Sequence, residues 1–329
     1  MQLNAEVTST IVRFSIKSHG HARSFFKADK ARQQRAKNMR LATIKLNNEE
    51  VASIVVGQGF IPIALANKEF GKNWPTDMLE LIRAGKVDEI NQWYREGGDA
   101  RLASLGEKIV PREAIQFAPL VRRPRKIWGI GLNYRDHAAD LAETSPTAEP
   151  ASFMKPDTAI IGDSDTIEIP LMSEKTTAEA ELGIVFGKTS KHVSKEDWQS
   201  AICGYVSIID MTAEDILRRN PRNLTQSKSF DTFISLGPIL VTPDEVADVN
   251  SLQVKTLING RTHAENVVSN MTFPPNYLVS YHSDIMTLLP GDILSTGTPG
   301  AVHINDGDVV ECHIDGFEPL VNQVVDLKL

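Results

Sequence analysis

Two glutamates, Glu179 and Glu181, stand two positions apart in residues 177–187, TAEAELGIVFG, which the sequence predicts to be a β-strand. Side chains at positions i and i+2 of a strand leave the same face, so the two carboxylates are expected to point the same way. At that spacing they repel each other unless one is protonated or a cation lies between them. An exposed strand face would tolerate the pair in water, but the apolar run over residues 182–186 predicts a buried strand. A buried acid needs a partner.

A third carboxylate, Asp210, ends the next apolar segment, residues 204–210, GYVSIID. We expect this segment to be a buried strand that stops at Asp210, and the end of a buried strand is a good place for a ligand. Three carboxylates with no histidine or cysteine nearby form a set of hard oxygen donors, which suits Mg²⁺, Mn²⁺ or Ca²⁺ better than Zn²⁺. The spacing alone leaves two interpretations open, a divalent-metal site and a solvated acidic strand face.

A histidine and an acid, His137 and Asp140, lie three positions apart in residues 133–140, NYRDHAAD. On one face of a short helix, the acid can orient the imidazole and stabilise its charge. Such a pair is suited to activating a water molecule, although an exposed His–Asp pair commonly has no such role. The small, proline-containing residues 144–150 that follow would allow this helix to act as a lid over a site.

Lys228 lies in a polar and aromatic stretch, residues 227–233, SKSFDTF. A lysine in this setting can stabilise an oxyanion, and the alternative is a solvated loop lysine. The glycine-containing motifs point away from nucleotide binding. Gly129 and Gly131 begin a G-x-G pattern, but Tyr134 stands where a dinucleotide-binding fingerprint has its third glycine, and residues 296–300, TGTPG, lack a P-loop lysine.

Two regions must position these residues. From Met39 to about Val121 we expect a small α+β domain with strands near 41–46 and 51–56 and helices near 76–84 and 86–96. The basic, proline-containing residues 121–126, VRRPRK, then form the predicted domain boundary. The catalytic domain would cover residues 122–329.

Beyond the boundary, short β-type runs alternate with turn signals such as residues 290–292, PGD, and 305–308, NDGD. One helix is expected from Lys195 to about Cys203, capped by Ser194. A strand-rich chain without regular βα alternation favours a mixed β-strand roll or barrel over a doubly wound sheet. The predicted fold class is therefore α+β.

The composition is that of an ordinary globular protein: 329 residues, 41% hydrophobic, 23% charged, net charge −7. The negative charge argues against a general nucleic-acid or membrane-surface role. Cys203 and Cys312 lie in apolar or alternating stretches and are expected to be buried, reduced thiols. Residues 1–40 carry nine Lys and Arg against two acids. Residues 1–38 are therefore expected to be an extension of the folded chain, and the protein is then expected to be cytoplasmic. The alternative is that these residues are a mitochondrial presequence.

About residues 126–326 resemble the catalytic domain of the fumarylacetoacetate hydrolase family. The matching segments occur in the family's order: GLNYRDHAAD, FMKP, EAELGIVFG, GYVSIIDMTAED, KSFDTF, NG, LPGDILSTGTPGA and GDVVECHIDG. The resemblance implies a mixed β-strand roll, usually a homodimer, with Mg²⁺ or Mn²⁺ on Glu179, Glu181 and Asp210. It places His137 and Asp140 on a lid.

The resemblance also implies roles for further residues. Lys155 and Lys228 would lie near the metal, Lys228 as a catalytic residue, and Tyr134, Lys155 and Thr298 would contact the substrate. The implied reaction is hydrolysis of a C–C bond in a small 1,3-dicarbonyl or 2-oxo acid of the acylpyruvate or fumarylacetoacetate type. The alternative is decarboxylation or isomerisation of an oxaloacetate-like or hydroxymuconate-like acid, and a non-enzymatic, metal-stabilised module is a third hypothesis.

Three positions depart from the family pattern. Asp140 stands where the family usually has Glu, Glu214 where it has Arg, and Ala264 where it has Gln. Arg218 or Arg219 is a candidate replacement for the missing guanidinium. The departures leave metal binding intact and leave the substrate and the reaction open.

Overall fold

The computed structural model describes residues 39–57, 59–135 and 148–329. The predicted extension, residues 1–38, lies outside the described residues, as do His137 and Asp140. In the part of the chain that is described, no helix has the length and apolar character needed to span a bilayer.

The first region begins with an antiparallel meander of β1 (Arg40–Leu46), β2 (Glu49–Val56) and β3 (Gly59–Pro62). The turn between β1 and β2 consists of two asparagines with positive φ, 53° and 65°, as a tight hairpin requires. The α-helices that follow are α2 (Ile63–Phe70), α3 (Met78–Arg83), α4 (Lys86–Trp93) and the short α5 (Asp99–Ala103). Both predicted strands and both predicted helices are confirmed, while β3 and α2 were not predicted.

One sheet runs through both predicted domains. Strand β1 pairs antiparallel with β13 (Ile239–Val241), and Arg40 forms an ion pair of 2.6 Å with Glu245 just beyond β13. Strands from either side of the predicted boundary therefore share a hydrogen-bonded sheet. The boundary at residue 121 stays a prediction.

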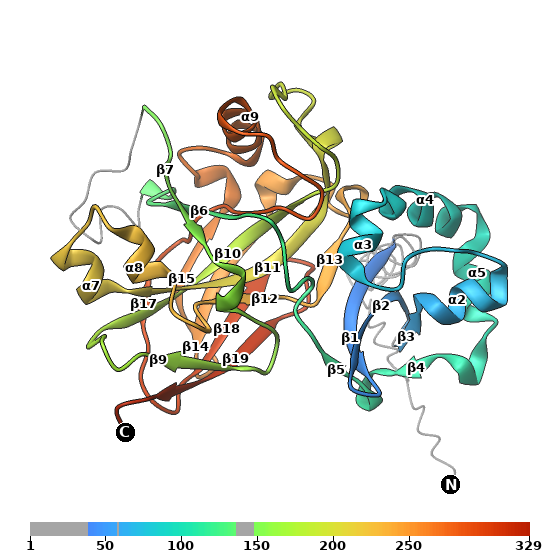
Figure 1. Ribbon diagram of the computed structural model, residues 1–329, viewed down its shortest axis with the longest axis horizontal. Helices are drawn as coiled ribbons and strands as arrows, with labels where there is room; N and C mark the ends of the chain where they lie inside the picture. The colour runs from blue at the N-terminus through green and yellow to red at the C-terminus, as the bar shows by residue number, and fades with distance from the viewer. Residues whose placement is uncertain (1–38, 58, 136–147) are drawn as a thin grey trace, which may run out of the picture. The chain divides into compact units, whose positions relative to one another are not determined.

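Two long antiparallel strands, β10 (Thr176–Phe186) and β11 (Ile202–Ala213), form the centre of this sheet, and both are buried along their whole length. On one side β11 pairs with β12 (Ile234–Leu236) and β13. On the other, β10 pairs with β16 (Ile293–Ser295), which pairs in turn with β6 (Ile127–Gly131), and β6 with β7 (Ala151–Lys155). Figure 1 shows β10 and β11 crossing the middle of this region.

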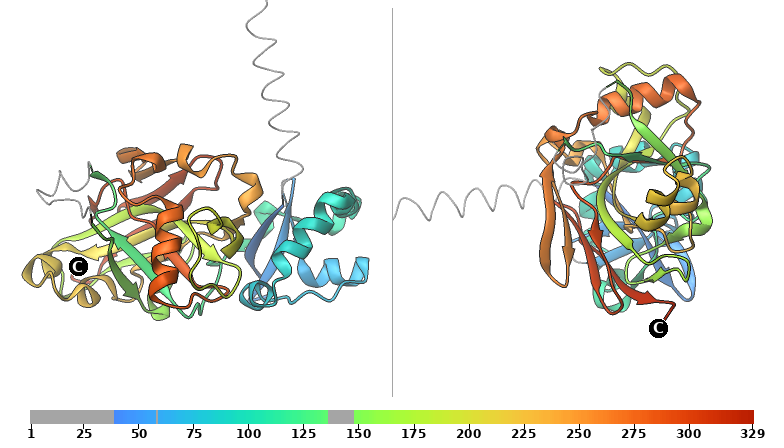
Figure 2. Two further views of the ribbon diagram at one scale, coloured as in Figure 1. Left: turned by 90° about the horizontal axis from the view of Figure 1, so that it is seen from above. Right: turned by 90° about the vertical axis from the view of Figure 1, so that its left-hand side faces the viewer.

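A second sheet contains β15 (Arg261–Val267), β14 (Gln253–Ile258), β18 (Val309–Ile314), β19 (Leu320–Asp326) and β9 (Thr166–Ile169), in that order. Buried and partly exposed side chains alternate along β14 and β18, so one face of this sheet enters the core. Figure 2 shows the second sheet as a separate layer beside β10 and β11, which it contacts through β14 and β18. Both sheets mix parallel and antiparallel pairs and neither closes into a barrel, so the fold is an α+β strand roll.

Two sequence-based expectations need correction. The helix expected over residues 195–203 is only a short 3-10 turn, Trp198–Ala201. Ser194 does accept the N–H of Asp197 at 3.1 Å, but β11 already begins at Ile202 and pairs with Phe186. Asp210 does not end its strand either, because β11 continues to Ala213. The two cysteines are free and buried, as expected.

Candidate metal centre and active-site cavity

The register of β10 against β11 brings the three carboxylates together. Glu179 lies directly opposite Asp210, and Glu181 follows two residues along the same strand face. One carboxylate oxygen from each of the three lies within 4.8 Å of the others, and all three side chains are buried. The predicted grouping of Glu179, Glu181 and Asp210 is therefore present in the structure.

Neutral donors fix the two glutamates. The Thr212 hydroxyl donates to Glu179 Oε1 at 2.7 Å. The Ser295 hydroxyl and the Gly297 N–H both donate to Glu181 Oε2, at 2.5 and 2.8 Å. Gly297 has φ +97°, and a Cβ at this position would lie 2.7 Å from Asn133 Cβ, so the turn requires glycine.

Asn133 supports the same turn, and its neighbour Tyr134 is buried beside it in the chain. The Asn133 amide donates to Phe273 O and Thr296 O at 3.0 and 2.7 Å, and its Oδ1 accepts the N–H of Phe273. Tyr134 is buried with its hydroxyl lacking a hydrogen-bond partner among the described residues. Burial, and then the charge of Glu181, raise the pKa of Tyr134. Its hydroxyl therefore remains a neutral donor close to the carboxylates.

Two buried lysines face the acids. Lys228 Nζ lies 3.1 Å from Glu179 Oε2 and 2.8 Å from Asp210 Oδ2. Burial opposes its charge, but Asp210 and Glu179 raise the pKa of Lys228 overall. Lys155 Nζ lies 2.5 Å from Asp210 Oδ1, and burial lowers the pKa of Lys155 to about 8 against the opposing effect of Asp210.

The Lys155 ammonium group is hydrogen-bonded to backbone carbonyls. Its ammonium donates to the carbonyls of Met211, Lys228 and Phe233 at 2.6 to 3.0 Å. Its contact with Asp210 Oδ1 lacks hydrogen-bond geometry, which leaves that oxygen without a hydrogen bond among the described residues. Lys155 thus joins β7, β11 and the chain around Lys228.

The donor set fits a divalent cation. Among the described residues, three buried carboxylates face two ammonium groups, so one negative charge has no cation beside it. Burial, together with the charges of Asp210 and Glu179, raises the pKa of Glu181 to about 8. A cation among the three carboxylates would relieve this repulsion and could bind Oδ1 of Asp210, which accepts no hydrogen bond among the described residues. Because the donors are all oxygens, Mg²⁺ or Mn²⁺ suits them.

A cavity of about 270 Å³ opens beside the carboxylates. Its lining combines a polar group around Glu179 with apolar residues and a second carboxylate, Glu214. Its described lining is Gly131, Leu132, Ala151, Phe153, Thr177, Glu179, Thr212, Glu214, Leu217, Pro221, Leu224, Lys228 and Ala301. The structure thus places Lys228 and Glu179, one of the three carboxylates, on the lining of a cavity large enough for a small organic acid.

The remaining predicted site residues are not among the described residues that line the cavity. The Thr298 hydroxyl is buried and engaged with its own loop, donating to Gly300 O at 3.1 Å. His137 and Asp140 belong to residues 136–147, outside the described part of the chain. Arg218, considered as a replacement for the family arginine, donates instead to Glu214, with Nη2 at 2.6 Å.

The family model for the fumarylacetoacetate (FAA) hydrolase C-terminal domain matches residues 126–325. The chain belongs to the fumarylacetoacetate hydrolase family. A mitochondrial oxaloacetate tautomerase of Rattus norvegicus is 31% identical over 300 residues, covering 89% of this chain and 93% of the relative. An uncharacterized protein of Archaeoglobus fulgidus is 40% identical over 228 residues, covering 69% of this chain and 89% of the relative.

Solved structures of the family share the fold. A maleylpyruvate hydrolase from Sphingobium sp. SYK-6 has 27% identity and a TM-score of 0.70, covering 88% of this chain and 100% of its own. A complex of that enzyme with manganese(II) and pyruvate has 26% identity and a TM-score of 0.70, covering 88% and 99%. A 5-carboxymethyl-2-hydroxymuconate delta-isomerase from Mycobacterium smegmatis has 27% identity and a TM-score of 0.67, covering 88% and 99%. The family's named members are thus hydrolases, isomerases and tautomerases.

Thr212 and Ser295 are among the contributors to the site that were not predicted from the sequence. Thr212 holds Glu179, and it stands two residues after Asp210 on the same strand face, so strand alternation alone points to it. Ser295 holds Glu181 from β16, a neighbour of β10 whose pairing no local pattern reveals.

Proposed function

We propose that this protein is a divalent-metal-dependent hydrolase that cleaves a C–C bond in a small 1,3-dicarbonyl or 2-oxo acid of the acylpyruvate or fumarylacetoacetate type. The observation that carries the proposal is the buried set of Glu179, Glu181 and Asp210, with Lys228 beside it, at the end of a small cavity. The likeness to a maleylpyruvate hydrolase whose structure contains manganese(II) and pyruvate supports both the metal and the substrate class.

Glu179, Glu181 and Asp210 would hold Mg²⁺ or Mn²⁺, and a bound ion of this kind supplies Lewis acidity toward the oxygens of a 2-oxo acid. Lys228, charged and buried, is placed to stabilise the negative charge of the enolate that leaves when the C–C bond breaks. Tyr134 and Thr298 are proposed substrate contacts. Lys155, proposed from the resemblance as another, is bound to three carbonyls, and we assign it the positioning of Asp210 and Lys228.

The nucleophile is proposed from the sequence. His137, oriented by Asp140, would take a proton from a water molecule whose oxygen attacks the distal carbonyl carbon. The C–C bond then breaks, its electron pair goes to the enolate, and the enolate takes up a proton to give the second acid. The shorter Asp140 in place of the family's usual Glu leaves this arrangement possible.

A second candidate is tautomerisation, isomerisation or decarboxylation of an oxaloacetate-like or hydroxymuconate-like acid. The name of the rat relative, an oxaloacetate tautomerase that aligns with 89% of this chain, favours it. These reactions use the same metal site and Lys228, but they need no attacking water.

Turnover in ¹⁸O-labelled water separates the two candidates. With Mg²⁺ or Mn²⁺ and an acylpyruvate, hydrolysis places label in the new carboxylate, and His137→Ala should lower this rate by about 10²–10⁴-fold without weakening metal binding. Oxaloacetate, fumarylpyruvate and hydroxymuconates complete the substrate panel. A His137→Ala protein that is fully active and incorporates no label supports the second candidate. Metal binding without turnover of any panel member supports a metal-stabilised module.

We also propose a homodimer and a cytoplasmic location. The mitochondrial relatives favour the alternative, in which residues 1–38 act as a presequence.

A further inference from the structure

The two ends of the active-site cavity differ in chemistry. At the carboxylate end, the Thr177 and Thr212 hydroxyls and the Lys228 ammonium all hydrogen-bond to Glu179. The remaining described side chains of the lining, termed the far end, are apolar except for one carboxylate, Glu214. The apolar far-end group is Leu132, Ala151, Leu217, Pro221, Leu224 and Ala301, whereas the Phe153 ring lies at the carboxylate end, with its centroid 4.6 Å from Lys228 Nζ.

Two short helices build this far end. Helix α7 (Glu214–Arg219) begins directly after β11 and supplies Glu214 and Leu217, while α8 (Leu224–Lys228) supplies Leu224 and ends at Lys228. Figure 1 shows α7 and α8 side by side, and α8 contacts β7 and β11. The same pair of helices therefore links the far end of the cavity to the metal end.

Glu214 is a charged wall residue. Burial opposes its ionisation, but hydrogen bonds from Lys175 and Arg218 lower the pKa of Glu214 below its ordinary value. Lys175 Nζ lies 2.7 Å from Oε2, and Arg218 Nη2 lies 2.6 Å from Oε1. Both cations are turned toward solvent, with side chains 47% and 61% exposed, and neither lines the cavity. Glu214 therefore engages both cations outside the cavity lining, and neither is placed to pair with a ligand in the cavity.

This arrangement discriminates between ligand ends. A carboxylate placed among these apolar side chains loses water and gains no donor from the described far-end side chains, and it would have to compete with Glu214 for Lys175 and Arg218. An alkyl or aryl group at the same place gains from its burial and leaves the ion pairs of Glu214 intact.

We propose that Glu214 and the apolar wall select 2-oxo acids whose end remote from the 2-oxo acid group is uncharged, and that they reject dicarboxylates. The inference rests on the proposed function, because it takes the 2-oxo acid group to lie at the metal end. The matching substrates are acylpyruvates with an alkyl or aryl acyl group.

Binding of stable ligands tests the selection without turnover. The metal-loaded protein is titrated by calorimetry with 2-oxohexanoate and with 2-oxoadipate, which have six carbons each and differ in the charge of the remote end. Pyruvate, which has no remote end, reports the shared group. Wild type should bind 2-oxohexanoate at least about tenfold more tightly than 2-oxoadipate, a difference of about 1.4 kcal/mol. Equal affinities, or tighter binding of 2-oxoadipate, overturn the inference.

Variants locate the cause. Glu214→Arg should reverse the preference at least about tenfold in favour of 2-oxoadipate while the affinity for pyruvate stays within about twofold. Leu217→Lys places a cation on the same wall at a half-buried position, so it tests the wall even if Glu214→Arg fails to fold. Glu174→Arg is the matched control, since it makes the same charge change at an exposed position outside the cavity, and it should keep the wild-type preference.

The pyruvate titration separates the two levels of the argument. If pyruvate binds and the six-carbon pair is not distinguished, the selection by Glu214 is wrong and the proposed function stands. If the metal binds but neither pyruvate nor either longer acid does, the proposed function fails and the inference fails with it.

Discussion

Glu181 is the carboxylate that the lysines compensate least. Lys228 contacts Glu179 and Asp210, and Lys155 contacts Asp210. The described hydrogen bonds to Glu181 come instead from neutral donors, the Ser295 hydroxyl and the Gly297 N–H. Its pKa is raised to about 8 by burial and by the charges of Asp210 and Glu179. A divalent cation therefore relieves more repulsion at Glu181 than at either neighbour.

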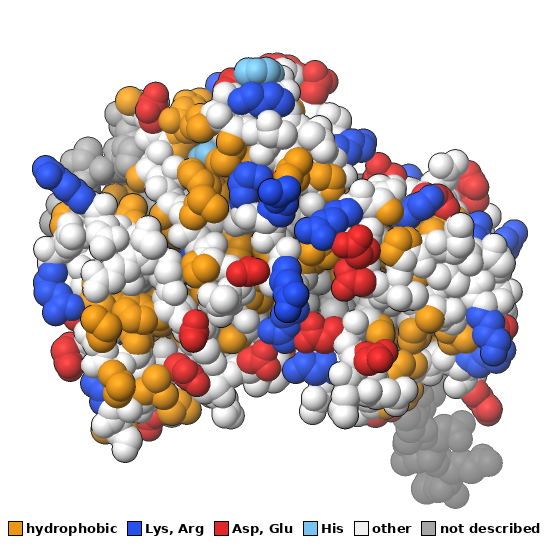
Figure 3. Space-filling model, viewed as in Figure 1, with side chains coloured by type: hydrophobic (Ala, Val, Ile, Leu, Met, Phe, Trp, Pro, Cys, Tyr) orange, Lys and Arg blue, Asp and Glu red, His pale blue; other side chains and the backbone are white. Residues whose placement is uncertain are grey.

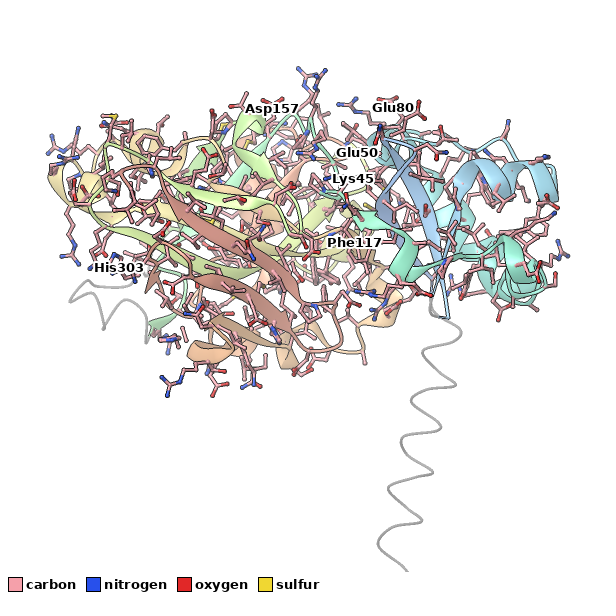
Figure 4. All side chains as sticks on the ribbon, turned by 90° about the horizontal axis from the view of Figure 1, so that it is seen from below. Lys45, Glu50, Glu80, Phe117, Asp157 and His303 are labelled. Carbon is pink, nitrogen blue, oxygen red and sulfur yellow. The ribbon has the colours of Figure 1, made fainter. Side chains whose placement is uncertain are left out.

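Removing this carboxylate should weaken metal binding. Glu181→Ala is expected to raise the dissociation constant for Mg²⁺ or Mn²⁺ by at least about tenfold, because affinity depends on the number of charged ligands. Calorimetric titration measures it. Asp157→Ala, which removes an exposed acid labelled in Figure 4, should bind the metal like wild type. Equal affinities for Glu181→Ala and wild type would show that the metal site is assigned wrongly.

His282 links stability to pH away from the cavity. It is buried in α9 (Pro275–Ile285), its Nδ1–H donates to Leu278 O at 2.8 Å, and its Nε2 has no hydrogen-bond partner among the described residues. Burial lowers the pKa of His282, so the folded protein keeps the ring neutral where the unfolded chain protonates it. The free energy of unfolding should therefore fall as the pH drops below about 6.5, by up to about 1.4 kcal/mol per pH unit.

Urea unfolding between pH 7.5 and 5 measures this dependence. His282→Phe should flatten it, since no proton is then taken up at this position on unfolding. His303→Asn removes an exposed histidine, labelled in Figure 4, and should keep the wild-type slope. An unchanged slope in His282→Phe would contradict the assignment.

Local pattern predicts part of the site. Strand alternation places Glu179 and Glu181 on one face, and this is what the structure has. The pairing of Glu179 with Asp210 depends on the register between β10 and β11, which the spacing of residues in the sequence does not determine. Lys155 and Lys228 come from separate segments whose approach to Asp210 is tertiary, so only the family resemblance predicted that they lie near the metal.

At the scale of elements, tertiary pairing overrides a local helix signal. Ser194 caps the backbone at Asp197 as predicted, yet the following residues make only one turn. The Gly187 N–H donates to Ala201 O, and Ile202 pairs with Phe186, which draws this segment into β11. The strands around the site were predictable because their apolar, β-branched runs are long, whereas the short helix α7 has too few residues to show a period.

The turn after β16 connects backbone conformation to the metal site. Gly297→Ala should destabilise the protein by about 1–2 kcal/mol for its positive φ, and by about 1–3 kcal/mol more because the new Cβ meets Asn133 Cβ at 2.7 Å. It should also weaken metal binding, since the Gly297 N–H holds Glu181. Urea unfolding and calorimetry measure the two effects.

Gly260→Ala is the matched control for this turn. Gly260 also has positive φ, +73°, but a Cβ there meets nothing within 4 Å. The free energy of unfolding of Gly260→Ala should therefore fall only by the part that comes from the positive φ. Its metal affinity should equal that of wild type. Equal losses in the two variants would show that the contact with Asn133 does not matter.

At the scale of the whole molecule, one sheet contains strands from both predicted domains, although the change in sequence composition suggests a boundary between them. The basic, proline-containing residues 121–126 mark a change of sequence character, but β1 joins β13 and Thr242 donates its hydroxyl to Met39 O at 3.0 Å. Sheet pairing between distant segments leaves no local pattern in the sequence. The fold class was predictable from the strand-rich second region, and the continuity of the sheet was not.

An exposed apolar group marks a candidate surface for the proposed homodimer. Strands β9 and β19 run parallel, and beyond their paired residues Ile169 and Asp326 lie Leu171, Met172 and Leu327. Leu171 and Met172 are 66% and 58% exposed. Figure 3 shows apolar side chains gathered at the lower left, where Figure 1 has β9 and the C-terminus. Exposed apolar surface of this kind is typical of an interface.

Sedimentation velocity at micromolar concentration tests this surface. Wild type should sediment as a dimer, and the double change Leu171→Glu with Met172→Glu should shift it to the monomer, because association would bury two unpaired charges. Ile285→Glu adds a charge at a similarly exposed apolar residue on α9, 57% exposed, and should leave the dimer intact. A monomeric wild type contradicts the homodimer. A double variant that stays dimeric moves the interface to another face, and Ile285→Glu then indicates whether α9 forms it.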